Sequence, residues 1–83
     1  MSNNETTNFD FKFNGSEEIK KILEDVYNAL AAKGYDPVSQ MTGYLISGDP
    51  TYITSHHEAR KLIREVDRDE IIIELIKSYI DKE

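Results

Sequence analysis

Three arginines spaced four residues apart are the clearest candidates for chemistry in this sequence. Arg60, Arg64 and Arg68 are its only arginines, and the other basic residues are lysines scattered along the chain. On one continuous helix they would lie in a single row, with His56 one turn upstream. A guanidinium binds carboxylate or phosphate through two parallel hydrogen bonds, which lysine cannot do. We therefore expect the row to bind a partner's acidic patch or a phosphate. The alternative is surface ion pairs with nearby carboxylates, which contribute little.

Two hydroxyl groups near the N-terminus form a second candidate site. Thr6 and Thr7 follow Glu5 in a polar stretch, residues 1–8, that has no hydrophobic periodicity. Such a segment cannot bury enough surface to order itself, so we expect an accessible tail. Phosphorylation there would add nearly two negative charges and three strong acceptors.

An aromatic stretch follows this tail. Phe9, Phe11 and Phe13 alternate at a spacing of two and are the only phenylalanines in the chain. That spacing places them on one face of an extended segment. We therefore predict a flexible arm over residues 1–13, ahead of a single helical domain over residues 14–83. The arm would pack on its own or a partner's helices, or would be a peptide presented to an enzyme or adaptor.

Signatures of catalysis and of metal binding are missing from the sequence. It contains neither a nucleophile elbow nor a phosphate-binding glycine loop. His56 and His57 are adjacent, so on a helix they would point about 100° apart and could not share one metal ion. We expect no catalytic residue, metal or cofactor. A convergent pocket with a buried histidine or carboxylate would favour an enzyme instead.

Composition restricts the location and the partners. The net charge of -6 opposes general nucleic-acid binding, because a polyanion is repelled. The sequence has no cysteine and no apolar run of membrane-spanning length, and its first residues do not resemble a signal sequence. We expect a cytoplasmic protein that contacts neither nucleic acid nor membrane.

Helix start and stop signals divide the rest of the chain. Asp36-Pro37 and Asp49-Pro50 each combine an N-cap with proline at the first helical position, and Gly34 and Gly48 precede them as helix ends. Capping boxes are expected where Ser55 and Asp67 each precede a glutamate by three residues. We predict an all-α fold, a compact bundle with an extended N-terminal arm. Its elements would be helices over 16–33, 37–47, 55–66 and 67–80 and a short helical turn over 50–53.

The last predicted helix is apolar on more than one side. One small monomer does not need so wide an apolar surface, and 83 residues are near the lower size limit for a self-sufficient core. We therefore expect a homodimer. Its interface would use Ile72, Leu75, Ile76 and Tyr79.

Several motifs together resemble the IreB/ReoM family of small regulatory phosphoproteins of Gram-positive Firmicutes. The resemblance extends from Thr6 to Tyr79. It is carried by Lys33-Gly-Tyr-Asp-Pro, Gln40, Gly43-Tyr-Leu-Ile-Ser-Gly-Asp-Pro, Tyr52-Ile53, His56, Ala59-Arg60, Ile63-Arg64, Arg68-Asp-Glu-Ile-Ile and Glu74-Leu.

This resemblance implies a cytosolic helical homodimer without catalytic activity. It also implies phosphorylation on an N-terminal threonine by a PASTA-type Ser/Thr kinase, reversed by the partner phosphatase. Members of this family link that kinase to cell-wall control and antibiotic tolerance. In one branch they assist Clp-protease turnover of the enzyme that commits UDP-GlcNAc to peptidoglycan synthesis.

The family's functional residues transfer onto particular positions of this chain. The phosphoacceptor stands three residues before the first Phe, which is Thr6, and the functionally important arginines are Arg60, Arg64 and Arg68. Two departures matter: Thr54-Ser55 replaces Pro-Arg, and Thr7 adds a second possible acceptor. A constitutive structural homodimer without phospho-switching is the alternative function.

Overall fold

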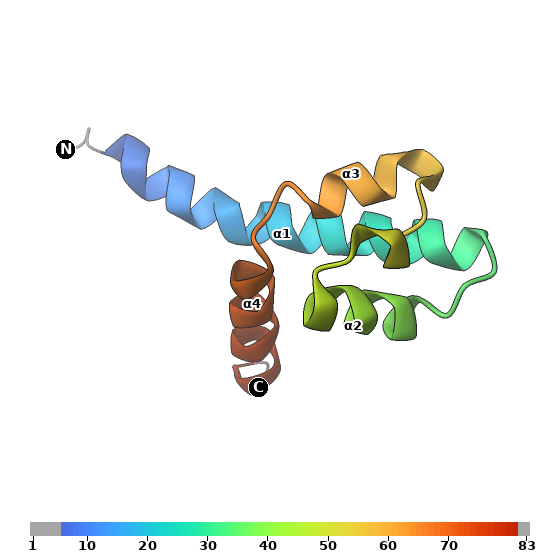
Figure 1. Cartoon of the computed structure of the whole chain (residues 1–83). Helices are drawn as coiled ribbons and strands as arrows, with labels where there is room; N and C mark the ends of the chain where they lie inside the picture. The colour runs from blue at the N-terminus through green and yellow to red at the C-terminus, as the bar shows by residue number, and fades with distance from the viewer. Residues whose placement is uncertain (1–5, 82–83) are drawn as a thin grey trace.

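The computed structural model describes residues 6–81, and side chains from residue 15 onward, as a helical bundle (Figure 1). Within these residues there is no strand, so the predicted all-α fold is confirmed. A second 3-10 turn, η2, was not predicted. The elements are α1 (Thr6–Ala32), α2 (Pro37–Ser47), the 3-10 turns η1 (Pro50–Tyr52) and η2 (His56–Glu58), α3 (Ala59–Ile63) and α4 (Arg68–Ile80).

The long helix α1 organises the bundle. Helices α2 and α3 both pack along it, and α4 crosses it nearer its N-terminal end (Figure 1). One apolar side of α1 forms much of the core, with Val26 and Leu30 fully buried. The core residues are Ile19, Ile22, Val26, Ala29, Leu30, Tyr44, Ile53, Ala59, Ile63 and Ile71. Since Tyr44 is the one buried residue of α2, the central helix is α1 and not α2, although the helix-end signals gather around α2.

The N-terminal part of α1 corrects the predicted arm. The backbone of residues 6–13 is helical, so the extended arm inferred from the phenylalanine spacing was wrong. Once a helix has formed, each added residue gains a hydrogen bond without a new nucleation cost. Residues 6–14 contain no proline, and Gly15 costs only about 1 kcal/mol in a helix interior. Residues 1–5, part of the predicted tail, lie outside the described residues.

Helix α2 has the ends that its sequence predicts. The Asp36 carboxylate accepts a hydrogen bond from the Ser39 N–H at 3.4 Å, and Pro37 opens the helix. At the other end Gly48 adopts a left-handed conformation, φ 78°, and its N–H donates to the Tyr44 carbonyl at 2.7 Å. Both helix signals around this segment are therefore confirmed.

A close approach explains the glycine inside α2. The ring of Tyr52 in η1 occupies the space that a Cβ on Gly43 would need. The Gln40 side-chain amide also donates to the Tyr52 carbonyl at 2.9 Å. These contacts fold η1 back onto α2, as the predicted turn near Pro50 requires.

The two predicted capping boxes are wrong. Ser55 makes no cap hydrogen bond; the His56 N–H donates instead to the Thr54 hydroxyl at 3.2 Å. His57 and Glu58 have φ of 52° and 61°, so the chain leaves helical geometry just where Glu58 would have reached back. Helix α3 therefore spans only five residues. Asp67 precedes α4 as predicted, but its carboxylate makes no cap hydrogen bond either.

Truncating the centre of the core should destabilise the fold strongly. Leu30→Ala removes a fully buried side chain, and we expect a loss of about 2–5 kcal/mol in the free energy of unfolding. Ile46→Ala is the matched control, because Ile46 is 78% exposed and should change that value by less than about 0.5 kcal/mol. Urea denaturation followed by circular dichroism measures both. Equal effects of the two substitutions would contradict this core.

Candidate functional site

The three arginines do not form the predicted single row. Arg60 lies in α3, Arg64 is the residue that ends it, and Arg68 begins α4. The chain turns between the two helices at residues 64–67. The row required one continuous helix from residue 55 to the second cap, and the short α3 breaks it.

Arg60 is committed to the backbone of the preceding loop. Its Nε–H donates to the carbonyl of buried Ile53 at 2.8 Å, and the side chain is half-buried. Asp49 lies close enough for Arg60 to contribute to its lowered pKa. The larger causes of that lowering are hydrogen bonds from the backbone N–H and the hydroxyl of Thr51. Arg60 therefore joins the loop after η1 to α3.

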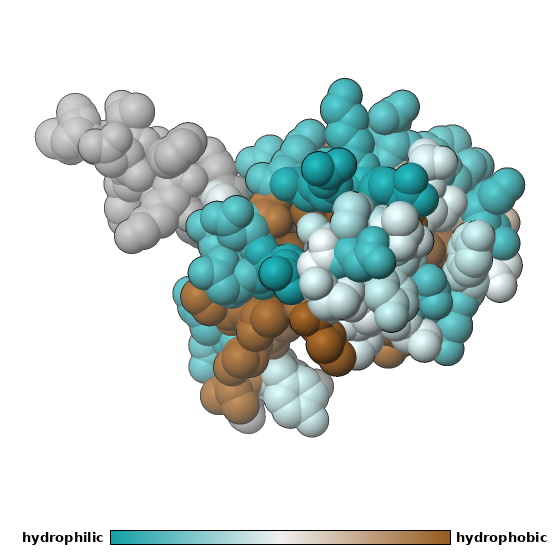
Figure 2. Space-filling model, in the orientation of Figure 1, coloured by the Kyte–Doolittle hydropathy of each residue, from teal (hydrophilic) through white to brown (hydrophobic). Residues whose placement is uncertain are grey.

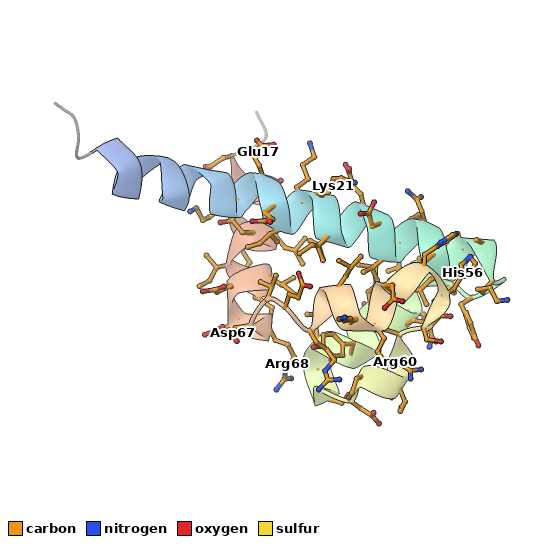
Figure 3. The ribbon with its side chains drawn as sticks, turned by 90° about the horizontal axis from the view of Figure 1, so that it is seen from above. Glu17, Lys21, His56, Arg60, Asp67 and Arg68 are labelled. Atoms are coloured by element: carbon orange, nitrogen blue, oxygen red, sulfur yellow. The ribbon has the colours of Figure 1, made fainter. Side chains whose placement is uncertain are left out.

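Arg68 is committed to the end of α2. Its Nη1 donates to the Leu45 carbonyl at 3.0 Å, across 23 residues of sequence. The guanidinium lies so close to Gly48 that a Cβ there would be 2.8 Å from its central carbon. In Figure 3, Arg60 and Arg68 lie along the same edge of the molecule, on different helices.

Arg64 differs from the other two arginines. Its side chain is exposed, as is that of Arg68, but within residues 15–81 the Arg64 side chain makes neither a hydrogen bond nor an ion pair. The alternative of surface ion pairs is not what the described residues show for Arg60 and Arg68, whose side-chain hydrogen bonds in this part of the chain go to backbone carbonyls. Of the three, Arg64 is the one whose guanidinium has no hydrogen-bond partner within residues 15–81, so all its donors can bind an external carboxylate or phosphate.

His56 lies away from Arg68, near the end of α1 (Figure 3). Its ring is 4.0 Å from that of His57, centroid to centroid. Burial lowers the pKa of His56, and the charges of His57 and Lys33 lower it further. A histidine held in the neutral form adds no positive charge to the arginines near neutral pH.

Two negative findings apply to residues 6–81. No group of three or more His, Cys, Asp or Glu side chains could hold a metal ion. No helix of this region is long and apolar enough to cross a bilayer.

Helix α4 exposes most of its apolar side chains. Only Ile71 is buried, and Figure 2 shows a hydrophobic band over this helix. The four predicted interface residues are all exposed, but they do not share one face. Leu75 lines a groove beside α1, whereas Ile72 lines a smaller hollow with Arg68. The exposed large apolar residues of α4 are Ile72, Ile73, Leu75, Ile76, Tyr79 and Ile80.

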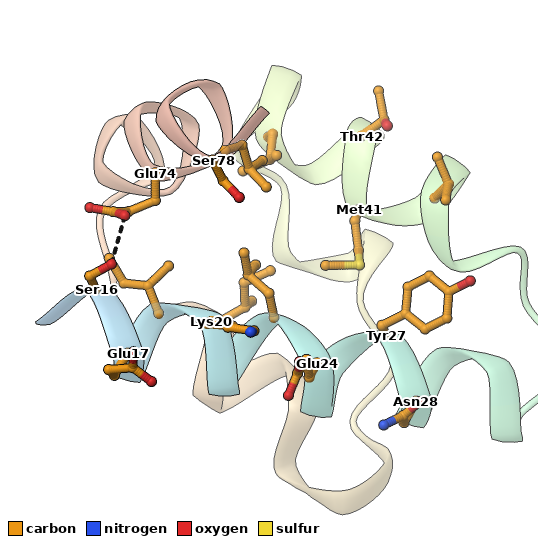
Figure 4. Close-up of a pocket in the computed structure, with 16 residues that line it drawn as sticks. Ser16, Glu17, Lys20, Glu24, Tyr27, Asn28, Met41, Thr42, Glu74 and Ser78 are labelled. Atoms are coloured by element: carbon orange, nitrogen blue, oxygen red, sulfur yellow. Dashed lines mark hydrogen bonds between the residues drawn. The ribbon is translucent and has the colours of Figure 1, made fainter. Parts of the chain in front are cut away.

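The groove beside Leu75 encloses about 780 Å³ between α1, α2 and α4 (Figure 4). Its apolar lining includes Leu23, Met41 and Leu45. The Ser16 hydroxyl donates to Glu74 at 2.9 Å and closes one end. Sequence reasoning missed this groove, because spacing within single helices does not show which helix faces meet.

Thr6 and Thr7 are the first two residues of α1. Their backbone positions are described, whereas their hydroxyl groups lie outside the described side chains. Their role as phosphoacceptors stays a prediction.

The chain also matches a known protein family. A family model described as "IreB regulatory phosphoprotein" matches residues 4–81. The matched stretch includes every helix described above.

The lowered pKa of His56 predicts a pH dependence of stability. The folded chain binds protons at His56 less readily than the unfolded chain, so stability should fall as the pH drops below the ordinary value of 6.5. His56→Gln should lose less stability than the wild type between pH 7.5 and pH 5. Urea midpoints at several pH values and an NMR titration of the imidazole measure this. A pKa at or above 6.5 in the folded protein would contradict it.

Proposed function

Because the chain belongs to the IreB family of regulatory phosphoproteins, we propose that it is a substrate of a PASTA-type Ser/Thr kinase and its partner phosphatase. In this proposal it acts in the cytoplasm, without catalysis, as an adaptor in the control of peptidoglycan synthesis and antibiotic tolerance. The observation that carries the proposal is the family match over residues 4–81. Thr6 is the first phosphoacceptor candidate and Thr7 the second.

Exposed Arg64 supports the adaptor role. A guanidinium without a partner in the described part of the chain can bind an acidic protein surface bidentately. We propose two candidates for this partner. One is Clp protease, and the other is the enzyme that Clp protease degrades, the first committed enzyme of peptidoglycan synthesis. Phosphate on Thr6 would change that contact by adding negative charge to a protein whose net charge is already -6.

The exposed surface of α4 supports self-association. Full burial of one large apolar side chain contributes about 1.5–3 kcal/mol, and α4 exposes six of them. The 13 residues of α4 form a rod of about 20 Å. The stretch of α1 that lines the groove, residues 16–28, has nearly the same length. We propose a two-fold symmetric dimer in which α4 of a second copy covers the exposed apolar surface of α4 and the groove beside α1.

A constitutive structural dimer is the competing function. It would use the same α4 surface and would need neither phosphorylation nor Arg64. The two following experiments separate phospho-switching from dimer formation.

The first experiment tests the phosphoacceptor. Purified kinase domain and ATP should phosphorylate the wild-type chain, and Thr6→Ala should remove most of the label because it removes the accepting hydroxyl. Thr7→Ala is the control and should keep it. Intact-mass spectrometry with peptide mapping measures both. If Thr6→Ala keeps its label and Thr7→Ala loses it, the phosphoacceptor is Thr7. If the wild-type chain is not labelled at all, the proposal is refuted.

The second experiment tests the dimer. Ile76→Asp places a charge on the exposed side of α4 and should give a 9.6 kDa monomer under conditions where the wild type has twice that mass. Ile46→Asp, on the exposed side of α2, should remain dimeric. Sedimentation equilibrium gives the masses, and circular dichroism confirms retained helix. A wild-type chain that stays monomeric at 100 times the working concentration would refute this interface.

A further inference from the structure

We propose that Arg68 is a positioning residue: its guanidinium caps the C-terminal end of α2 and thereby fixes the direction of α4. Arg64 is then the arginine left to contact a partner. This inference rests on the proposed function in one respect, because it gives α4 its role as the dimer surface.

The first step concerns the carbonyls at the end of α2. The last four C=O groups of a helix have no partner within it. Here the Gly48 N–H donates to the Tyr44 carbonyl at 2.7 Å, and Arg68 donates to the Leu45 carbonyl at 3.0 Å. A positive charge at this end also interacts favourably with the helix dipole. Arg68 therefore supplies a donor to this helix end that the neighbouring sequence does not supply.

The second step concerns Gly48. Its left-handed conformation, φ 78°, could be adopted by asparagine as well. Asparagine would require the guanidinium to move away, since a Cβ at this position would lie 2.8 Å from both its central carbon and one of its nitrogens. Glycine at this position therefore permits the observed placement of the Arg68 guanidinium, in addition to the left-handed backbone conformation.

The third step concerns how α4 is held. Three of its anchors are buried Ile71, Glu74, which accepts the Ser16 hydrogen bond, and Arg68, which binds the end of α2. Of the larger helices, α1 is the one that α4 packs against most. Arg68 is the first residue of α4, directly after the turn at residues 64–67. Its hydrogen bond therefore fixes the helix at the point where the helix could pivot.

The consequence is a division of roles among the arginines. Loss of Arg68 should disturb the α4 surface and the dimer, whereas loss of exposed Arg64 should leave both intact. A regulatory defect in an Arg68 variant would then arise through α4 and not through a lost partner contact.

The test combines Arg68→Ala, Gly48→Asn and the double variant. Arg68→Ala should raise the dimer dissociation constant about tenfold or more, as expected for loss of a hydrogen bond from a charged donor. It should also speed amide hydrogen exchange in α4 but not in residues 22–30 of α1. Gly48→Asn alone should do the same, because the new side chain displaces the guanidinium. In the Arg68→Ala background, Gly48→Asn should add little, since the displaced group is gone.

Two further variants complete the design. Arg64→Ala should keep the wild-type dissociation constant and exchange rates. Arg68→Lys should restore much of the wild-type behaviour, because it keeps the charge and one donor at the α2 end. Should Arg68→Ala fail to fold, Gly48→Asn and Arg68→Lys give the same comparison.

Unchanged α4 exchange in Arg68→Ala, or fully additive effects of the two substitutions, would overturn the inference. A wild-type monomer would refute the proposed dimer alone, because the exchange rates and their non-additivity still test the cap.

Discussion

The carbonyl groups at the end of α2 need hydrogen-bond donors, and one of these donors comes from α4, which is thereby joined to α2. One donor is local, the N–H of left-handed Gly48, and the other is Arg68 from the start of α4. Arg60 likewise donates a hydrogen bond to the carbonyl of Ile53, which follows η1. Two of the three arginines therefore donate hydrogen bonds to backbone carbonyls at the two ends of the segment that links α2 to α3. This is how a short chain with a small core fixes α4, although α4 buries only Ile71.

This arrangement changes the interpretation of the arginine pattern. Spacing alone predicts one ridge of three guanidinium groups, which requires one continuous helix. The left-handed residues His57 and Glu58 and the turn after Arg64 break that helix. A hydrogen bond between residues 23 positions apart, such as that of Arg68 to Leu45, leaves no periodic signal in the sequence. For the same reason the groove between α1, α2 and α4 could not be predicted, because it depends on how three helices meet.

Local signals were more reliable. Asp36, Pro37 and Gly48 mark the ends of α2 correctly, because caps depend on the conformation of neighbouring residues. The end of α1 near residue 33 and the start of α4 at Arg68 were also predicted. Ser55 shows the limit of such signals, since its capping box is replaced by the Thr54 hydroxyl. The phenylalanine alternation failed because three residues at a spacing of two are a weak strand signal beside a helix that can simply be extended.

The family match and the geometry support one account of a regulatory phosphoprotein, in which α1 carries the candidate phosphoacceptors, α4 offers an apolar surface and Arg64 is exposed. Its central claim is the contact between Arg68 and Gly48. NMR of the labelled wild-type protein tests it most directly, through nuclear Overhauser effects between the Gly48 Hα protons and the side-chain protons of Arg68. We expect clear cross-peaks, because the guanidinium lies against the face of Gly48 where a Cβ would stand. Their absence in a protein whose α2 and α4 are helical would contradict the account.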